Sequence, residues 1–127
     1  MKLLIDTNLL LWAALGDRRF PDAATALLAD PAGELYVSSA SIWEVAIKTT
    51  RPGSGLPDPL DLHRQLLNNG YLELPISSAH AAAVQGLPPI HKDPFDRILV
   101  AQATVEGITL LTTDRKVTRY PGPIRKV

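Results

Sequence analysis

The sequence contains no cysteine among its 127 residues. This absence excludes disulfide bonds, thiolate metal sites and thiol catalysis. An excess of charge is also missing, because thirteen Lys and Arg residues balance thirteen Asp and Glu residues. Zero net charge argues against a protein that coats nucleic acid through a global positive field, although an enzyme with a local basic rim stays compatible with it. Any contact with nucleic acid is therefore expected to be local.

Long apolar runs are missing as well. The stretch from Leu9 to Leu15 is apolar throughout but only seven residues long, whereas a membrane helix needs ~20 such residues. The apolar start of the chain is interrupted by Asp6 and Asn8, which argues against a signal peptide. The cytoplasm is the expected location.

The order of strand and helix signals predicts one α/β domain. Hydrophobic residues make up 46% and charged residues 20% of the chain, which is ordinary for a globular protein of modal domain size. Alternation of strands and helices favours a three-layer α/β/α arrangement with a mostly parallel central sheet, over residues 1–127. Strands are expected at 2–6, 35–37, 71–74, 108–112 and around Ile124. Helices are expected at 7–15, 21–29 and 58–69, and from Pro94 to the residue before Gly107, with Asp93 as the cap. Two more are expected, one ending near 49 that Ser39 or Ser41 caps and one from Ser77 or Ser78 to 85.

Four acidic residues fall where this fold would bring them together. Asp6 and Asp114 lie at or just beyond the carboxyl ends of strands, and ligands of open parallel sheets bind outside those ends. Asp96 lies in the first turn of a helix and Glu44 about one turn into another, so both can reach the same edge. Converging carboxylates repel one another unless a cation lies between them, and Mg²⁺ or Mn²⁺ with a phosphate substrate fits that need. The pattern predicts a metal-dependent phosphodiester nuclease.

Each acid also has a purely structural interpretation. Asp6 could be a turn or cap residue after its strand, and Asp114 could begin a short helix. Asp96 could interact favourably with its helix dipole, a gain of ~0.3–1 kcal/mol. Glu44 precedes Lys48 by four residues, the favoured order for a surface ion pair on a helix. Only their predicted convergence on one edge favours the metal site.

Residues near the four acids have open roles. Asp93 precedes Pro94 and is expected to cap a helix, with a role as a fifth acid as the alternative. His91 is expected to be a solvated loop residue, with a substrate contact as the alternative. Arg97 and Arg115 could neutralise the acids or hold RNA phosphates, and Asn8 could orient the neighbouring Asp.

Four blocks of sequence resemble the PIN-domain family, and more narrowly the toxin ribonucleases of toxin–antitoxin pairs of the VapC type. The similarity covers essentially the whole chain, and the blocks occur in family order. They are LLIDTNLL at 3–10, SASIWEVAIK at 39–48, HKDPFDRILVAQA at 91–103 and LTTDR at 111–115. Matched residue by residue, the family's metal-binding acids fall on Asp6, Glu44, Asp96 and Asp114, and Thr112 takes the place of a hydroxyl near the metal. The segment 49–55 departs from relatives, which often carry a more basic Gly-Lys stretch there.

The resemblance implies an activity and partners. It implies an endoribonuclease that uses Mg²⁺, with Mn²⁺ as the alternative ion, and in which an activated water attacks phosphorus in line and leaves 5′-phosphate and 3′-hydroxyl ends. The implied substrate is RNA, with tRNA as the expected target. A homodimer and a cognate antitoxin are also implied. The apolar stretch 9–15 would either form an exposed patch for such partners or lie in the core, and Trp12 and Trp43 are expected in the core or an interface.

Three alternatives stay open. The first is a PIN enzyme of RNA processing or DNA-structure cleavage that has no antitoxin. The second is a phosphatase of the haloacid dehalogenase type, whose chemistry needs a second acid where this chain has Asn8. The third is a PIN fold that has lost its chemistry and serves as a binding module.

Overall fold

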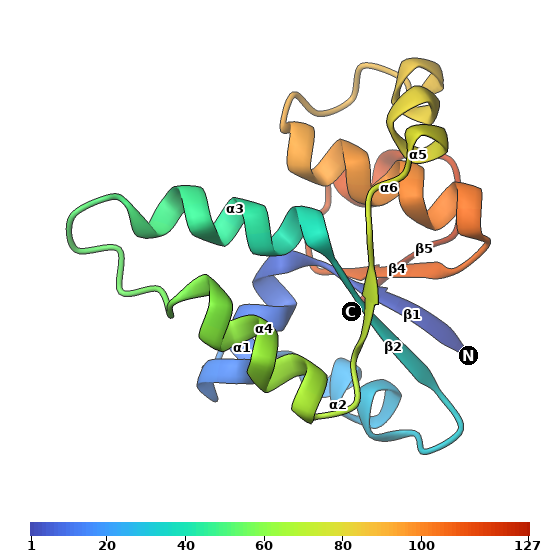
Figure 1. Ribbon diagram of the computed structural model, residues 1–127. Helices are drawn as coiled ribbons and strands as arrows, with labels where there is room; N and C mark the ends of the chain where they lie inside the picture. The colour runs from blue at the N-terminus through green and yellow to red at the C-terminus, as the bar shows by residue number, and fades with distance from the viewer.

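A computed structural model describes residues 1–127 and contains one five-stranded sheet (Figure 1). Every pair of neighbouring strands is parallel, in the order β3-β2-β1-β4-β5. The sheet is therefore wholly parallel, where the sequence predicted a mostly parallel one. The strands are β1 (Lys2–Ile5), β2 (Glu34–Ser38), β3 (Leu72–Leu74), β4 (Thr109–Thr112) and β5 (Ile124–Lys126).

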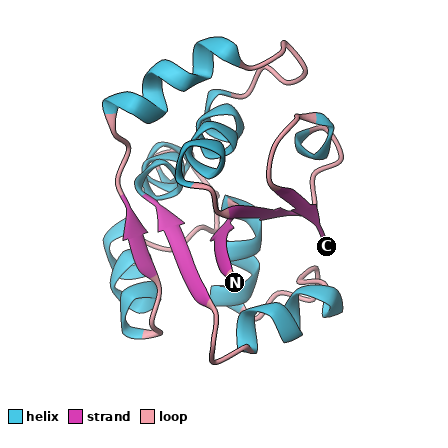
Figure 2. Ribbon diagram, turned by 90° about the vertical axis from the view of Figure 1, so that its right-hand side faces the viewer, coloured by secondary structure: helices cyan, strands magenta, loops and turns pink.

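Helices cover both faces of the sheet (Figures 1 and 2), which confirms the predicted three-layer α/β/α fold. Helices α1, α2 and α4 pack on one face, α6 packs on the other with α5 beside it, and α3 contacts both α4 and α6. The helices are α1 (Thr7–Leu15), α2 (Asp22–Ala29), α3 (Ser39–Thr49), α4 (Pro59–Asn68), α5 (Ser78–Ala83) and α6 (Pro94–Glu106), and two short 3₁₀ turns are η1 (Val84–Gly86) and η2 (Val117–Arg119). No helix combines the length and apolar character that crossing a membrane requires.

The central strand β1 shows why the chain forms layers. Successive side chains of a strand point to opposite faces. Leu3 and Ile5 join the apolar cluster under α1 and α4, whereas Leu4 joins the cluster under α6. All three are buried, and a strand that is apolar on both faces requires helices on both sides.

The helix ends follow local sequence, with one correction. Asp58 and Asp93 cap α4 and α6, each followed by Pro at the first helical position, and Gly107 ends α6 in the left-handed conformation at φ 66°. These features were predicted. The cap of α3 was predicted wrongly, because Ser38 and not Ser39 or Ser41 accepts the N–H of Ala40.

The apolar stretch 9–15 lies largely in the core. Leu9, Leu10 and Leu11 are buried under the sheet, so they do not form an exposed patch. Within this stretch Ala13 and Leu15 are exposed, and Leu15 is 52% exposed.

The strand order fixes where a ligand would bind. The chain runs outward from β1 through β2 to β3, and then returns to the other side of β1 to add β4 and β5. The order thus reverses between β1 and β4, and ligands of open α/β sheets bind outside the carboxyl ends at such a switch point. Asp6 follows β1 there and Asp114 lies two residues beyond β4.

Candidate metal centre

The carboxyl edge of the sheet holds a small polar cavity of about 160 Å³ with no apolar residue in its lining. Its walls come from four segments that are far apart in the sequence: the start of α1, the middle of α3, the start of α6 and the loop after β4. All four predicted acids line this cavity. The full lining is Asp6, Thr7, Asn8, Glu44, Lys48, His91, Asp93, Asp96 and Asp114.

Asp6 is the most firmly held of the acids. Its Oδ1 accepts the N–H of Leu9, which caps α1, and its Oδ2 accepts the hydroxyl of Thr112. Burial raises the pKa of Asp6 above its usual range, although both hydrogen bonds oppose the shift. The interpretation of Asp6 as a cap is confirmed by the hydrogen bond to Leu9, and the same residue lines the cavity.

Thr112 links two of the acids. The register of β1 and β4 pairs Ile5 with Leu111, which places Thr112 beside Asp6. The Thr112 hydroxyl donates to Asp6 and accepts the backbone N–H of Asp114 at 3.0 Å. One buried hydroxyl thus sets the positions of acids from two neighbouring strands.

Glu44 forms the ion pair that the sequence allowed, and it also lines the cavity. Its Oε2 lies 2.6 Å from Lys48 Nζ, four residues along α3. The pair is not a surface pair in the ordinary sense, because Glu44 is buried and both residues line the cavity. Lys48 therefore compensates part of the negative charge at the site.

Asp96 carries the clearest sign of electrostatic conflict. Burial, followed by the charges of the surrounding carboxylates, raises the pKa of Asp96 to about 7. Asp93 is the largest contributor among these charges, ahead of Glu44, Asp6 and Asp114. Asp96 does lie in the first turn of α6 as predicted, but the lowering that a helix dipole produces is smaller than these opposing effects.

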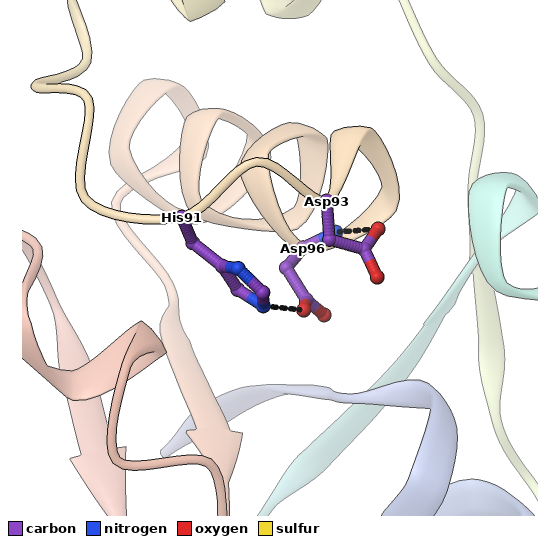
Figure 3. Close-up of side chains that lie close together, drawn as sticks. All are labelled: His91, Asp93 and Asp96. Carbon is purple, nitrogen blue, oxygen red and sulfur yellow. Dashed lines mark hydrogen bonds and ion pairs between the residues drawn. The ribbon is translucent and has the colours of Figure 1, made fainter.

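The tightest group of possible ligands at the site is His91, Asp93 and Asp96 (Figure 3). One ligand atom from each lies within 4.8 Å of the other two. Asp93 is the helix cap, with Oδ1 accepting the N–H groups of Phe95 and Asp96. His91 Nε2 lies 3.0 Å from Asp96 Oδ2 and 3.8 Å from Asp114 Oδ2. Sequence reasoning placed His91 in solvent, whereas its side chain is only 20% exposed and lies among the acids.

The arginine of the third motif, Arg97, has different surroundings from those predicted. Arg97 donates to the carbonyl oxygens of Pro88, Val84 and Leu87 and to the hydroxyl of Tyr120. Its guanidinium therefore holds the loop before α6, and this corrects the expectation that it neutralises the acids or holds RNA.

The sequence left the roles of two further residues undecided. Arg115 is exposed beside Asp114, and Asn8 lines the cavity at an exposed position.

The donor set fits a hard divalent cation. Five Asp and Glu side chains line the cavity against one lysine and one histidine, and burial, with a smaller contribution from neighbouring carboxylates, raises the pKa of both Asp6 and Asp96. Carboxylate oxygens are the ligands that Mg²⁺ and Mn²⁺ take in proteins. Asp6, Glu44, Asp96 and Asp114 are therefore chemically suited to hold such an ion.

Replacing Thr112 by Val is expected to weaken metal binding by roughly 10–100-fold, the usual effect of losing a partner that orients a ligand. Valine keeps the shape but removes the hydroxyl that fixes Asp6 and accepts the Asp114 N–H. Calorimetric titration with Mn²⁺ measures the change, and Thr112→Ser, which keeps the hydroxyl, is the matched control. Equal affinity in the Val and Ser variants would contradict this role.

Comparisons with known proteins agree with the observed architecture. A family model described as the PIN domain matches residues 3–123. No curated protein matches the sequence. Among solved structures, VapBC2 from Rickettsia felis bound to a DNA fragment from its promoter gives a TM-score of 0.72 at 15% identity, covering 100% of this chain and 99% of that chain. A toxin–antitoxin complex from Klebsiella pneumoniae gives 0.66 at 20% identity, covering 97% and 95%. VapBC-1 from nontypeable Haemophilus influenzae gives 0.65 at 17% identity, covering 99% and 98%.

Proposed function

The chain belongs to the PIN-domain family, and from this premise we propose that it is a metal-dependent endoribonuclease, the toxin of a toxin–antitoxin pair, with residues 1–127 as one nuclease domain. One observation carries the proposal. Four acids from four separate segments line one polar cavity at the switch point of the sheet. A binding module without chemistry would have no use for buried, mutually repelling carboxylates, which cost stability unless a cation joins them.

The proposed roles follow from the contacts of each side chain. Asp6, Glu44, Asp96 and Asp114 would hold the ion, and the family resemblance implies Mg²⁺, with Mn²⁺ as the alternative. When bound, such an ion activates a water molecule and stabilises the charge that develops on a phosphate undergoing attack. Thr112 fixes the direction of the Asp6 carboxylate, and Lys48 fixes that of Glu44.

RNA is proposed as the substrate because positive charge is gathered near the cavity although the chain has none in excess. Lys48 lines the cavity with its side chain 42% exposed, so its ammonium can meet a phosphate. Lys92, Arg115 and Lys116 are exposed in the loops on either side. Such a local rim attracts a polyanion without a global field. We propose tRNA as the target on the family resemblance.

An antitoxin and a second copy of the chain are the proposed partners. A groove of about 680 Å³ runs between α1 and α2, lined half by apolar residues that include Trp12, Phe20 and Leu28. We propose that an antitoxin segment occupies this groove, and that a basic side chain of the antitoxin placed among the acids would compete with the metal. A second apolar surface lies away from this groove, where Trp43 of α3 packs edge-on against Phe95 of α6 with ring centroids 5.1 Å apart. Trp43 is 58% exposed, which supports this surface as the proposed homodimer interface.

Expression of the chain alone in bacteria is expected to stop growth, and co-expression of a small DNA-binding protein encoded beside it is expected to restore growth. The double variant Asp6→Asn/Asp96→Asn should be harmless at the same expression level, because the ion would lose two of its ligands. Growth curves and sequencing of cleaved RNA ends measure both effects, and tRNA should carry the new ends. Arrest by the double variant equal to that of the parent would contradict a catalytic cause.

A further inference from the structure

One histidine, His91, lines the acidic cavity. The predicted set of four metal-binding acids gives this imidazole no role. The chain has three histidines, and the other two are paired elsewhere. His63 contacts Glu73 at 3.0 Å, and His80 accepts the N–H of Ser77 and contacts Glu106. Of the three histidines, only His91 lines the acidic cavity, with its Nε2 3.0 Å from Asp96 Oδ2 (Figure 3) and 3.8 Å from Asp114 Oδ2.

The backbone of His91 is fixed from both sides by one hydroxyl. The OH of Tyr120 accepts the His91 N–H at 2.9 Å and donates to the His91 carbonyl at 3.1 Å. Tyr120 is buried and is held in turn by Arg97, whose Nη1 donates to the same hydroxyl at 3.1 Å. Arg97 also holds the carbonyl of Pro88 at 2.9 Å. The loop that presents His91 is therefore built to keep the imidazole in one place.

The position of the imidazole suits a ligand of one ion. Ligands about 2.1 Å from an octahedral ion lie about 3 Å apart when adjacent and about 4.2 Å apart when opposite. His91 Nε2 lies 3.0 Å from Asp96 Oδ2, which is the separation of adjacent ligands. Its distance of 3.8 Å from Asp114 Oδ2 lies between the adjacent and the opposite separation. Asp93 has one oxygen committed to the helix cap, and it completes a group whose ligand atoms lie within 4.8 Å of one another.

We propose that His91 is a further metal ligand of this site, that its nitrogen makes the site prefer Mn²⁺ to Mg²⁺, and that Tyr120 and Arg97 are its positioning residues. Mg²⁺ takes oxygen ligands, whereas imidazole favours first-row transition ions. Mn²⁺ is the member of that series that also suits carboxylate and water. The inference rests on the proposed function only in taking the acids as the metal site.

Pulsed electron paramagnetic resonance of the full-length protein loaded with Mn²⁺ tests direct ligation. Wild type is expected to show ¹⁴N coupling to the ion, and His91→Gln is expected to lose it. His63→Gln, which changes a histidine outside the cavity, should keep it. A wild-type spectrum without imidazole nitrogen coupling overturns the inference, and this result does not depend on whether a variant folds.

Calorimetric titration with Mn²⁺ alone and with Mg²⁺ alone tests the preference. His91→Gln should lower Mn²⁺ affinity by roughly tenfold or more, the scale on which even outer-shell partners act, and leave Mg²⁺ affinity nearly unchanged. Tyr120→Phe keeps the imidazole but frees the loop, so it should produce a smaller loss for Mn²⁺ only. If His91 merely neutralised the acids, both affinities would change together, and that result would overturn the inference.

The two proposals fail in different ways. RNA cleavage without nitrogen coupling would remove the ligand role of His91 and leave the nuclease standing. The protein could instead show nitrogen coupling that Asp6→Asn weakens and yet cleave no RNA. That pair of results would support the metal site and contradict the nuclease. If the protein bound neither Mn²⁺ nor Mg²⁺, both proposals would be overturned.

Discussion

Asp6→Asn is expected to lower metal-dependent RNA cleavage by at least roughly 100-fold, since a catalytic metal supplies several kcal/mol of transition-state stabilisation and each 1.36 kcal/mol is a factor of ten in rate. Asn keeps the cap of α1 and the size of the side chain but removes a charge that faces the cavity. Single-turnover cleavage of a labelled RNA, with the divalent ion in excess, measures the change.

Asp58→Asn is the matched control for this prediction. Asp58 also caps a helix, with its Oδ2 accepting the N–H groups of Leu60 and Asp61, but it lies outside the cavity. Asn is as good a cap as Asp, so both variants should fold like the parent while only Asp6→Asn loses activity. An equal loss in the two variants would indicate damage to the fold and not to a metal site.

Asp96→Asn is expected to stabilise the metal-free protein, by an amount that grows with pH. The folded pKa of Asp96 is raised from 3.8 to about 7, so between these values the folded protein binds more protons than the unfolded chain. Its free energy of unfolding therefore falls as pH rises towards 7, and Asn avoids that loss. The gain should be near zero at pH 4 and on the order of 3 kcal/mol at pH 8.

Urea denaturation in the presence of a chelator, at several pH values, measures this gain. Added Mn²⁺ should reverse it, because the ion stabilises the parent through its carboxylates and the variant has lost one of them. A gain that is the same at pH 4 and pH 8 would show that the carboxylate charge is not its source. A loss of stability at both values would show that Asp96 is a structural residue.

Local sequence was enough to predict most of the fold. Apolar strands such as β1 require helices on both faces, and Asp-Pro pairs with Gly107 mark the ends of α4 and α6. The burial of Leu9, Leu10 and Leu11 could not be predicted, because an all-apolar helix carries no preferred face and only the packing of α4 and the sheet decides it. The cap of α3 was missed because neighbouring serines compete for one role.

The part of the candidate site that follows strand ends was predictable, because parallel strands all end at one edge of the sheet. Asp6 and Asp114 follow parallel strands, and the caps of α3 and α6 turn Glu44 and Asp96 to the same edge. His91 lies in a loop, and its direction depends on Tyr120, 29 residues away. Arg97 likewise binds carbonyl groups that become neighbours only after the loop has folded. Contacts of this kind leave no periodic signal in the sequence.

The central claim is most directly tested by the chemistry of the RNA ends produced by the purified chain, with and without a divalent ion. The account predicts cleavage that stops when EDTA removes the metal, returns with added Mn²⁺ or Mg²⁺, and leaves 5′-phosphate and 3′-hydroxyl ends, because water and not a ribose hydroxyl attacks phosphorus. Cleavage that continues in EDTA and leaves 2′,3′-cyclic phosphate ends would contradict it.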